Sequence, residues 1–367
     1  MDFRHKRKPN RLVVAILTFC TTVIVTTVYL FMYHAESPES IEQLPEQSVV
    51  DLMGRADKLY VGGKFALAFD AYKAVIADSP DNAVAYARLA KTAALLNRNS
   101  DSIEFGLKAV ELDPGSGEAW ANLAMAYDWS GDPEKGLPAA QKAVQLAPDN
   151  AEATAFLAEV YADIGQYPRA LELAKKAVGM DPSSVDALRT LGYVLAGAGD
   201  QAGAITAYEQ AIHLNPNFGY IYVDLGSVYR AQRNDEMAVT QYQKAVELDS
   251  SNPRAYYNLG LLYYNKQEYG EAVGQFTKAV EVDGAYIPAL SYLAWSNYFG
   301  KDYSQAKTAF ERLLERQPGN AEGQAGLGWC YYFLGRYAEA RDRFQKALSL
   351  NGGQAMARQG MAAVEGR

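Results

Sequence analysis

Residues 253–286 read PRAYYNLGLLYYNKQEYGEAVGQFTKAVEVDGAY and contain two apolar stripes of helical spacing. Counted from the first residue of this stretch, positions 4, 7, 8 and 11 recur at i, i+3, i+4 and i+7, the spacing of one face of an α-helix. Leu259 and Gly260 occupy positions 7 and 8. Positions 20 and 24, Ala272 and Phe276, begin a second stripe. The stretch therefore predicts two helices joined by a short turn, each with one apolar face.

The same pattern recurs along the chain with a period of 34 residues. Five prolines fall at this spacing, namely Pro80, Pro114, Pro148, Pro182 and Pro216, where they would end helices. Position 7 is Leu in eight repeats, and position 8 is Ala or Gly in all of them. The spacing predicts nine repeats without an insertion, which we call units one to nine. These units are residues 49–82, 83–116, 117–150, 151–184, 185–218, 219–252, 253–286, 287–320 and 321–354.

The period, the Leu–Gly/Ala pair, the aromatic residue of the second helix and the terminal proline strongly resemble the tetratricopeptide repeat family. The resemblance covers residues 49–354 and implies an all-α, right-handed superhelical solenoid of about nine helical hairpins. One hairpin cannot bury its apolar stripe alone, so neighbouring units must stack. Residues 355–367 are expected to form a capping helix and tail. Pro138 falls inside a second helix and predicts a kink or a late helix start there.

The N-terminal segment differs in composition from the repeats. Residues 12–33 contain no charged side chain, and as a helix this run would match the thickness of a hydrocarbon core. Five Lys or Arg residues precede it, and residues 34–48 contain none. We expect a transmembrane signal-anchor helix at 12–33, a cytoplasmic basic tail at 1–11, and a linker at 34–48. The repeat array would then be extracytoplasmic, on the periplasmic or cell-surface side. Cleavage as a signal peptide is the alternative.

Charge and motif content exclude several classes of function. The net charge is −8, and residues 1–33 carry +4, so the rest of the chain carries −12. An acidic body does not fit the phosphate backbone of nucleic acid. The sequence contains three histidines and no metal-ligand spacing, nucleophile elbow or phosphate loop. We therefore expect no catalytic residue, no metal, no cofactor and no small-molecule substrate.

Aromatic residues are concentrated in units seven to nine. The family resemblance implies that first helices line a concave groove, with positions 2, 5, 9, 12 and 13 exposed to it; we call these the groove positions. Aromatic groove residues are Trp295, Trp329, Tyr298, Tyr332, Tyr257, Tyr264, Phe299 and Phe333. Asn258, at position 6, is where the family often holds a peptide backbone. These residues predict a surface for a peptide or helix, with Trp295 and Trp329 as its anchors and Phe299 and Phe333 as the most structural. The alternative is that they only pack between helices.

Acidic residues occupy groove positions of units three to five. This second set contains Asp128, Glu152, Glu159, Asp163 and Asp186. It predicts a site for a basic partner segment, and the alternative is a solvated acidic face.

These features together predict a membrane-anchored protein–protein interaction scaffold that binds proteins or peptides in its groove. One alternative is an envelope receptor that stacks glycans or other ligands on the aromatic groove. Another is an organelle-membrane receptor of the import type, with the array facing the cytosol.

Overall fold

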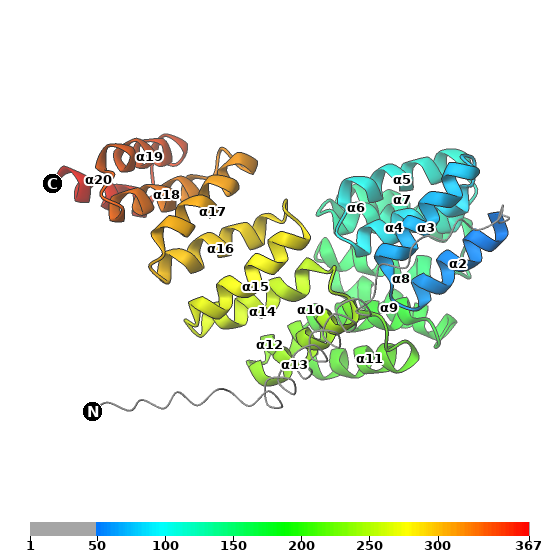
Figure 1. The fold of residues 1–367 in the computed structure, drawn as a ribbon. Helices are drawn as coiled ribbons and strands as arrows, with labels where there is room; N and C mark the ends of the chain where they lie inside the picture. Colours follow the sequence, from blue (N-terminus) through cyan, green and yellow to red (C-terminus); the bar gives the residue numbers. More distant parts are fainter. Residues whose placement is uncertain (1–48, 367) are drawn as a thin grey trace, which may run out of the picture. The chain divides into compact units, whose positions relative to one another are not determined.

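The computed structural model describes residues 49–366, and all regular structure in this part of the chain is α-helical (Figure 1). The expected all-α solenoid is confirmed for these residues. The helices are α2 (Val49–Val61), α3 (Phe65–Asp78), α4 (Ala83–Leu95), α5 (Asn99–Leu112), α6 (Gly117–Trp129), α7 (Pro133–Leu146), α8 (Ala151–Asp163), α9 (Tyr167–Met180), α10 (Val185–Gly197), α11 (Gln201–Leu214), α12 (Gly219–Ala231), α13 (Asp235–Leu248), α14 (Pro253–Asn265), α15 (Tyr269–Val282), α16 (Ile287–Phe299), α17 (Tyr303–Arg316), α18 (Ala321–Phe333), α19 (Tyr337–Leu350) and α20 (Ala355–Glu365).

The predicted membrane anchor at residues 12–33 lies outside the described residues. Within residues 49–366, no helix combines the length and the hydrophobicity that crossing a membrane requires.

Each 34-residue unit contains one pair of helices. The first helix has 13 residues and begins at position 1, and the second has 14 residues and begins at position 17. The two helices of a unit pack against each other, and from α4 onward each first helix also packs beside the first helix of the next unit. The shorter α20 follows the last pair and packs on α18 and α19.

Local signals in the sequence begin and end the first helices. Position 34 of the preceding unit often accepts a hydrogen bond from the first turn, as Asn150 does from the backbone N–H of Ala153. In the turn that joins the two helices of a unit, the residue at position 15 adopts a left-handed conformation in all nine units. Glycine occupies it in five units, for example Gly131 with φ 85°, and Lys301 adopts φ 65° at the same place. The turn is thus kept even where its residue has a side chain.

Close approach of the two helices in a unit depends on position 8. A Cβ atom placed on Gly260 would lie 2.6 Å from the ring of Phe276, which is completely buried. The ring at position 24 also reaches the next unit, because a Cβ atom on Gly326 would lie 2.3 Å from the ring of Phe310. In the six units with an aromatic residue at position 24, this ring therefore lies between the unit's own first helix and that of its neighbour. In units two to four, the ring is replaced by Gly106, Ala140 and Ala174.

The predicted late helix start near Pro138 is wrong. Helix α7 begins at Pro133 and continues through Pro138 to Leu146. Pro138 is exposed, and so is Glu134, whose carbonyl loses its helical partner. Water can solvate that carbonyl, so the helix tolerates the missing hydrogen bond.

Phe276→Ala should lower the local stability of units seven and eight by about 3–5 kcal/mol, because it opens a cavity between two helices. The measurement is amide hydrogen exchange of α14 to α17, with the free energy of opening compared with that of the wild type. Phe299→Ala is the matched control, since that ring is 44% exposed, and it should change the free energy by about 1 kcal/mol or less. Equal effects of the two substitutions would contradict the packing described here.

Candidate functional site

Lys91 joins groove positions of units that are not neighbours. Its Nζ lies 2.5 Å from Oε1 of Glu152 in unit four and 2.7 Å from Oδ2 of Asp186 in unit five. The same ammonium lies over the rings of Tyr60 and Phe156, 5.5 and 5.7 Å from their centroids. Burial lowers the pKa of Lys91, but attraction to Asp186 and Glu152 outweighs it and holds the pKa well above the ordinary value. Lys91 is therefore a charged group inside the stack.

Arg189 is a second internal cation in the same surface. Its Nη1 donates to both carboxylate oxygens of Glu159, at 3.0 and 2.9 Å, and its Nε donates to Oδ2 of Asp224 at 2.8 Å. The guanidinium also stacks 4.8 Å from the ring centroid of Trp129. The side chains of Arg189, Glu159 and Asp224 are only 5%, 4% and 8% exposed. A bidentate pair of this kind holds four consecutive units in one geometry.

Asp128 lies next to the carboxylates that bind Arg189, but it forms no ion pair of its own within residues 49–366. Burial and repulsion from Glu159 and Asp163 raise the pKa of Asp128 to about 9. At neutral pH this carboxyl is therefore protonated. Its Oδ1 is buried without a hydrogen-bond partner, and the neighbouring Asp163 accepts a hydrogen bond from the hydroxyl of Tyr193.

The predicted acidic set is thus paired largely within the chain. Glu152 and Asp186 share Lys91, and Glu159 binds Arg189. Sequence analysis missed Lys91 and Arg189, although both lie at groove positions and are basic residues among an excess of acids. A role of the acidic set in binding a partner stays a prediction.

Units one and five are in direct contact beside these ion pairs. The ring of Phe218 lies 5.7 Å from that of Tyr60 and 5.5 Å from that of Phe65. Next to them, Nδ2 of Asn215 donates to the backbone carbonyl of Val61 at 3.0 Å. These contacts join residues about 150 positions apart in the sequence. Groove positions of units one to five, together with Tyr220 of unit six, therefore face one another, and their own side chains occupy the space between them.

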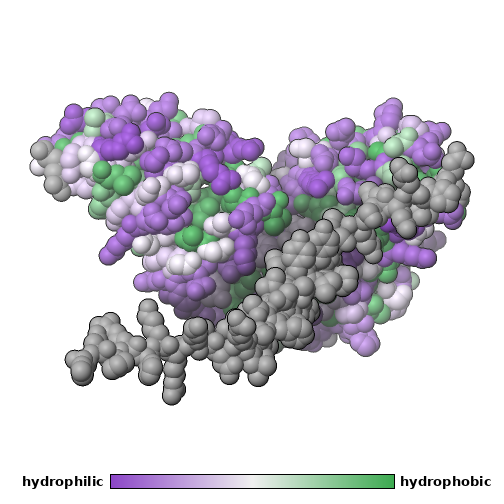
Figure 2. All heavy atoms as spheres, viewed as in Figure 1, coloured by the Kyte–Doolittle hydropathy of each residue, from purple (hydrophilic) through white to green (hydrophobic). Residues whose placement is uncertain are grey.

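The aromatic residues of units eight and nine form two equivalent stacks. Phe299 stacks on Tyr269 at 5.5 Å between centroids and on Trp295 at 5.8 Å. The equivalent stack, one unit further along the chain, contains Tyr303, Phe333 and Trp329. We call these six residues the aromatic floor. Apolar residues gather at the place of α16 in the space-filling view (Figure 2).

Exposure within the floor is the reverse of the expected order. Trp295 is only 8% exposed, because it packs against Phe310 with 5.0 Å between ring centroids. Phe299 and Phe333 are 44% and 47% exposed. The indole N–H of Trp329 donates to a backbone carbonyl of α20 at 3.1 Å. Position 9 points between helices, whereas position 13 lies near the helix end, where the stacked neighbours cover only part of the ring.

The other predicted groove residues lie close to the floor. Half-buried side chains are those of Tyr257, Tyr264, Tyr298 and Tyr332. Asn258 is buried, and its side chain donates to the carbonyl of Arg254 in its own helix. The side-chain amide of Asn258 is therefore engaged in a hydrogen bond within α14.

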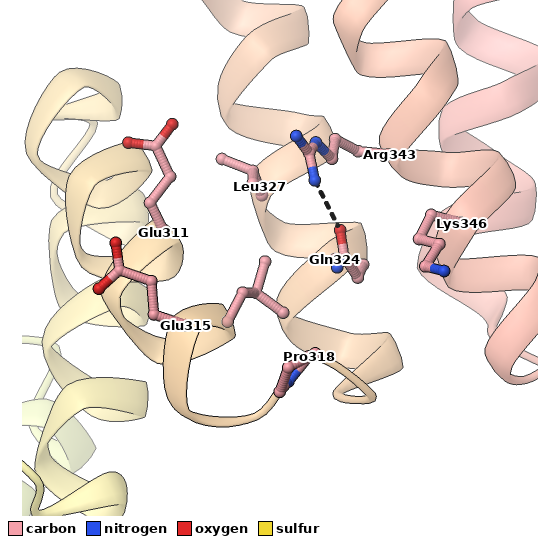
Figure 3. A pocket seen from close by; sticks show the side chains of 8 residues that line it. Glu311, Glu315, Pro318, Gln324, Leu327, Arg343 and Lys346 are labelled. Carbon is pink, nitrogen blue, oxygen red and sulfur yellow. Dashed lines mark hydrogen bonds between the residues drawn. The ribbon is translucent and has the colours of Figure 1, made fainter.

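The grooves in the described residues lie on another face of the units. One, with a volume of about 470 Å³, lies between α17 and the α18–α19 pair (Figure 3). Its charged lining includes Glu311, Glu315 and Arg343, and Arg343 donates to Gln324. A second groove near His213 occupies equivalent unit positions. This equivalence indicates that both grooves result from helix stacking. No cluster of three or more His, Cys, Asp or Glu side chains in residues 49–366 could hold a metal ion.

Sequence profiles identify the repeats. Profiles described as tetratricopeptide or TPR repeats match residues 53–117, 121–185, 157–219, 226–267, 253–286 and 300–364. The chain belongs to the tetratricopeptide repeat family. No curated protein matches this tetratricopeptide repeat chain in sequence.

Solved structures share the fold. A chain of the APC/C hetero-tetramer Cut9–Hcn1 matches 82% of this chain at 19% identity and a TM-score of 0.59, and the match spans 58% of that chain. A monomeric mutant of IFIT1 with Gppp-AAAA matches 83% of this chain and 72% of its own at 20% identity and a TM-score of 0.53. Pseudomonas aeruginosa pilF matches 59% of this chain and 98% of its own at 19% identity and a TM-score of 0.51. Likeness at this identity shows the fold alone.

Lys91→Met should lower the free energy of unfolding of units one to six by about 1–3 kcal/mol, because the partly buried Glu152 and Asp186, 32% and 18% exposed, would lose their cation. Hydrogen exchange of α4, α8 and α10 measures this loss. Lys108→Met is the control, since the pair of Lys108 with Glu111 is exposed and contributes about 0.5 kcal/mol or less. A Lys91→Met protein as stable as the control would show that the internal pairing is unimportant.

Proposed function

We propose that this chain is a membrane-anchored scaffold that binds partner proteins on the first helices of units seven to nine. Tetratricopeptide repeats generally act as protein-interaction scaffolds without catalytic activity. The observation that carries the proposal is the exposure of Phe299 and Phe333 at the same groove position of neighbouring units. Large apolar rings that are exposed and repeated across neighbouring helices are typical of interaction surfaces.

The contrast between the two parts of the array supports this location. In units two to five, groove positions are filled by Lys91, Arg189 and their carboxylates. A partner segment would have to displace buried ion pairs there. In units eight and nine, the rings at position 13 are open on one side, so binding requires no such displacement.

The floor fits a protein segment better than a sugar. Sugar stacking requires an open indole face, but Trp295 is covered by Phe299 and Phe310. Aliphatic or aromatic side chains of a partner need only a small apolar surface, which the exposed edges of the two phenylalanine rings supply.

The sequence supports the anchor and the side of the membrane. The uncharged run at 12–33 is long enough to cross a bilayer as a helix. The five basic residues before it favour a cytoplasmic N-terminus. We therefore propose that the array works on the extracytoplasmic side, where it would hold partners close to the membrane surface.

Phe299→Ser/Phe333→Ser should remove specific partners from the solubilised full-length protein, because both exposed rings are lost. Co-purification and mass spectrometry compare it with the wild type, after an alkaline carbonate wash shows whether the chain stays in the membrane pellet. Leu67→Ser/Leu107→Ser is the matched control. It removes similarly exposed apolar side chains, 56% and 47% exposed, from second helices.

Partners that remain with the control but disappear with the phenylalanine variant are the expected result. Identical partner lists for all three proteins would contradict a binding role for the floor. Release of the chain by the carbonate wash would contradict the anchor.

A further inference from the structure

One row of first-helix positions links the aromatic floor to a cation. Position 12 holds an arginine in unit six and a tyrosine in each of the next three units: Arg230, Tyr264, Tyr298 and Tyr332. The three tyrosines are half-buried, and burial raises the pKa of Tyr264 and Tyr298 to about 12. The phenols of Tyr264 and Tyr298 are therefore neutral at physiological pH and place hydroxyl groups beside apolar rings.

Arg230 lacks an internal partner, unlike Arg189 and Lys91. Its Nε is buried without a hydrogen bond, and no salt bridge of the described residues includes it. Its charge acts on Tyr257, where it opposes the rise to about 12 that burial causes in the pKa of that phenol. A half-buried guanidinium without an anion is costly to keep, and a carboxylate would satisfy it with charge-assisted hydrogen bonds.

The charged residues around this row determine which way a bound segment would run. Arg254 is 41% exposed and lies 3.6 Å from Asp224, which Arg189 already neutralises. Units six and seven therefore favour a negative group. Glu322 is exposed, and its charge acts on the phenol of Tyr264 in unit seven, so it repels a carboxylate placed beyond Arg230 along the row.

We propose that this surface takes an extended acidic–apolar segment of a partner protein, with a carboxylate on Arg230 and an apolar side chain on Phe299 or Phe333. This inference rests on the proposed scaffold function and specifies the chemistry of the partner. Its acidic residue lies towards unit six and its apolar residue towards unit nine. The charge match at Arg230 distinguishes this segment from a basic one, which the acidic remainder of the array would otherwise favour.

The repeat geometry sets the spacing of the segment. Neighbouring helices pack roughly 8–10 Å apart, so Phe299 lies about two such steps from Arg230 and Phe333 about three. An extended chain rises about 3.3 Å per residue. The carboxylate and the apolar side chain should therefore be separated by about five or six residues for Phe299 and about eight for Phe333.

Selection of random dodecapeptides, displayed on phage, against the solubilised full-length protein tests the proposal. We expect the retained peptides to carry an acidic residue at this spacing from an apolar one. A synthetic copy of a retained peptide should bind Arg230→Gln about tenfold to hundredfold more weakly than the wild type. Arg312→Gln, an exposed arginine of α17, is the control and should leave Kd unchanged.

A charge exchange separates recognition from folding. Arg230→Glu should reject the acidic peptide and bind a copy in which lysine replaces its acidic residue. Retained peptides that are basic, or an acidic peptide that binds Arg230→Gln as tightly as the wild type, would overturn the acidic–apolar assignment and leave the scaffold function standing. If the wild type retains no peptide while partners depend on Phe299 and Phe333 in co-purification, the extended segment is wrong. If neither binding is seen, the scaffold function also fails.

Discussion

Six of the nine units share one packing contact on which their stacking depends, the aromatic ring at position 24 against the small residue at position 8. Phe276 fits against Gly260 only because the glycine leaves room for the ring. The same kind of ring reaches the next unit, as Phe310 reaches Gly326. The second face of the ring is covered only by the next unit, so the units must stack in order. Their first helices then lie side by side, and residues one repeat apart become neighbours on one surface.

Sequence reasoning succeeds where the deciding contacts are local or repeated. Helix starts follow from caps such as Asn150 and turns from position 15, both within a few residues of the element they define. The equivalence of the two aromatic stacks follows from the period alone. Exposure could not be predicted in the same way, because Trp295 is covered by a residue of the second helix, Phe310. A list of groove positions does not contain that contact.

Contacts between distant units could not be predicted from the sequence. Lys91 meets Asp186 across 95 residues, and the period specifies only which units are neighbours. Whether units one and five meet depends on small rotations that add up over four interfaces, and no single residue encodes them. Buried ion pairs of this kind add little net stability. Their more specific effect is to fix one geometry, and in doing so they occupy the groove of units one to six. The binding surface is thereby confined to units seven to nine and to Arg230 near the end of α12 in unit six.

Hydroxyl-radical footprinting of the full-length protein measures this division directly, since aromatic side chains are oxidised according to their exposure. The account predicts rapid modification of Phe299 and Phe333, and protection of Phe156 and Tyr220 in the occupied units, which are 2% and 4% exposed. Equal modification of both pairs would show that units one to six are open to solvent. The central claim, that this chain fills one part of its groove and leaves the other for a partner, would then be contradicted.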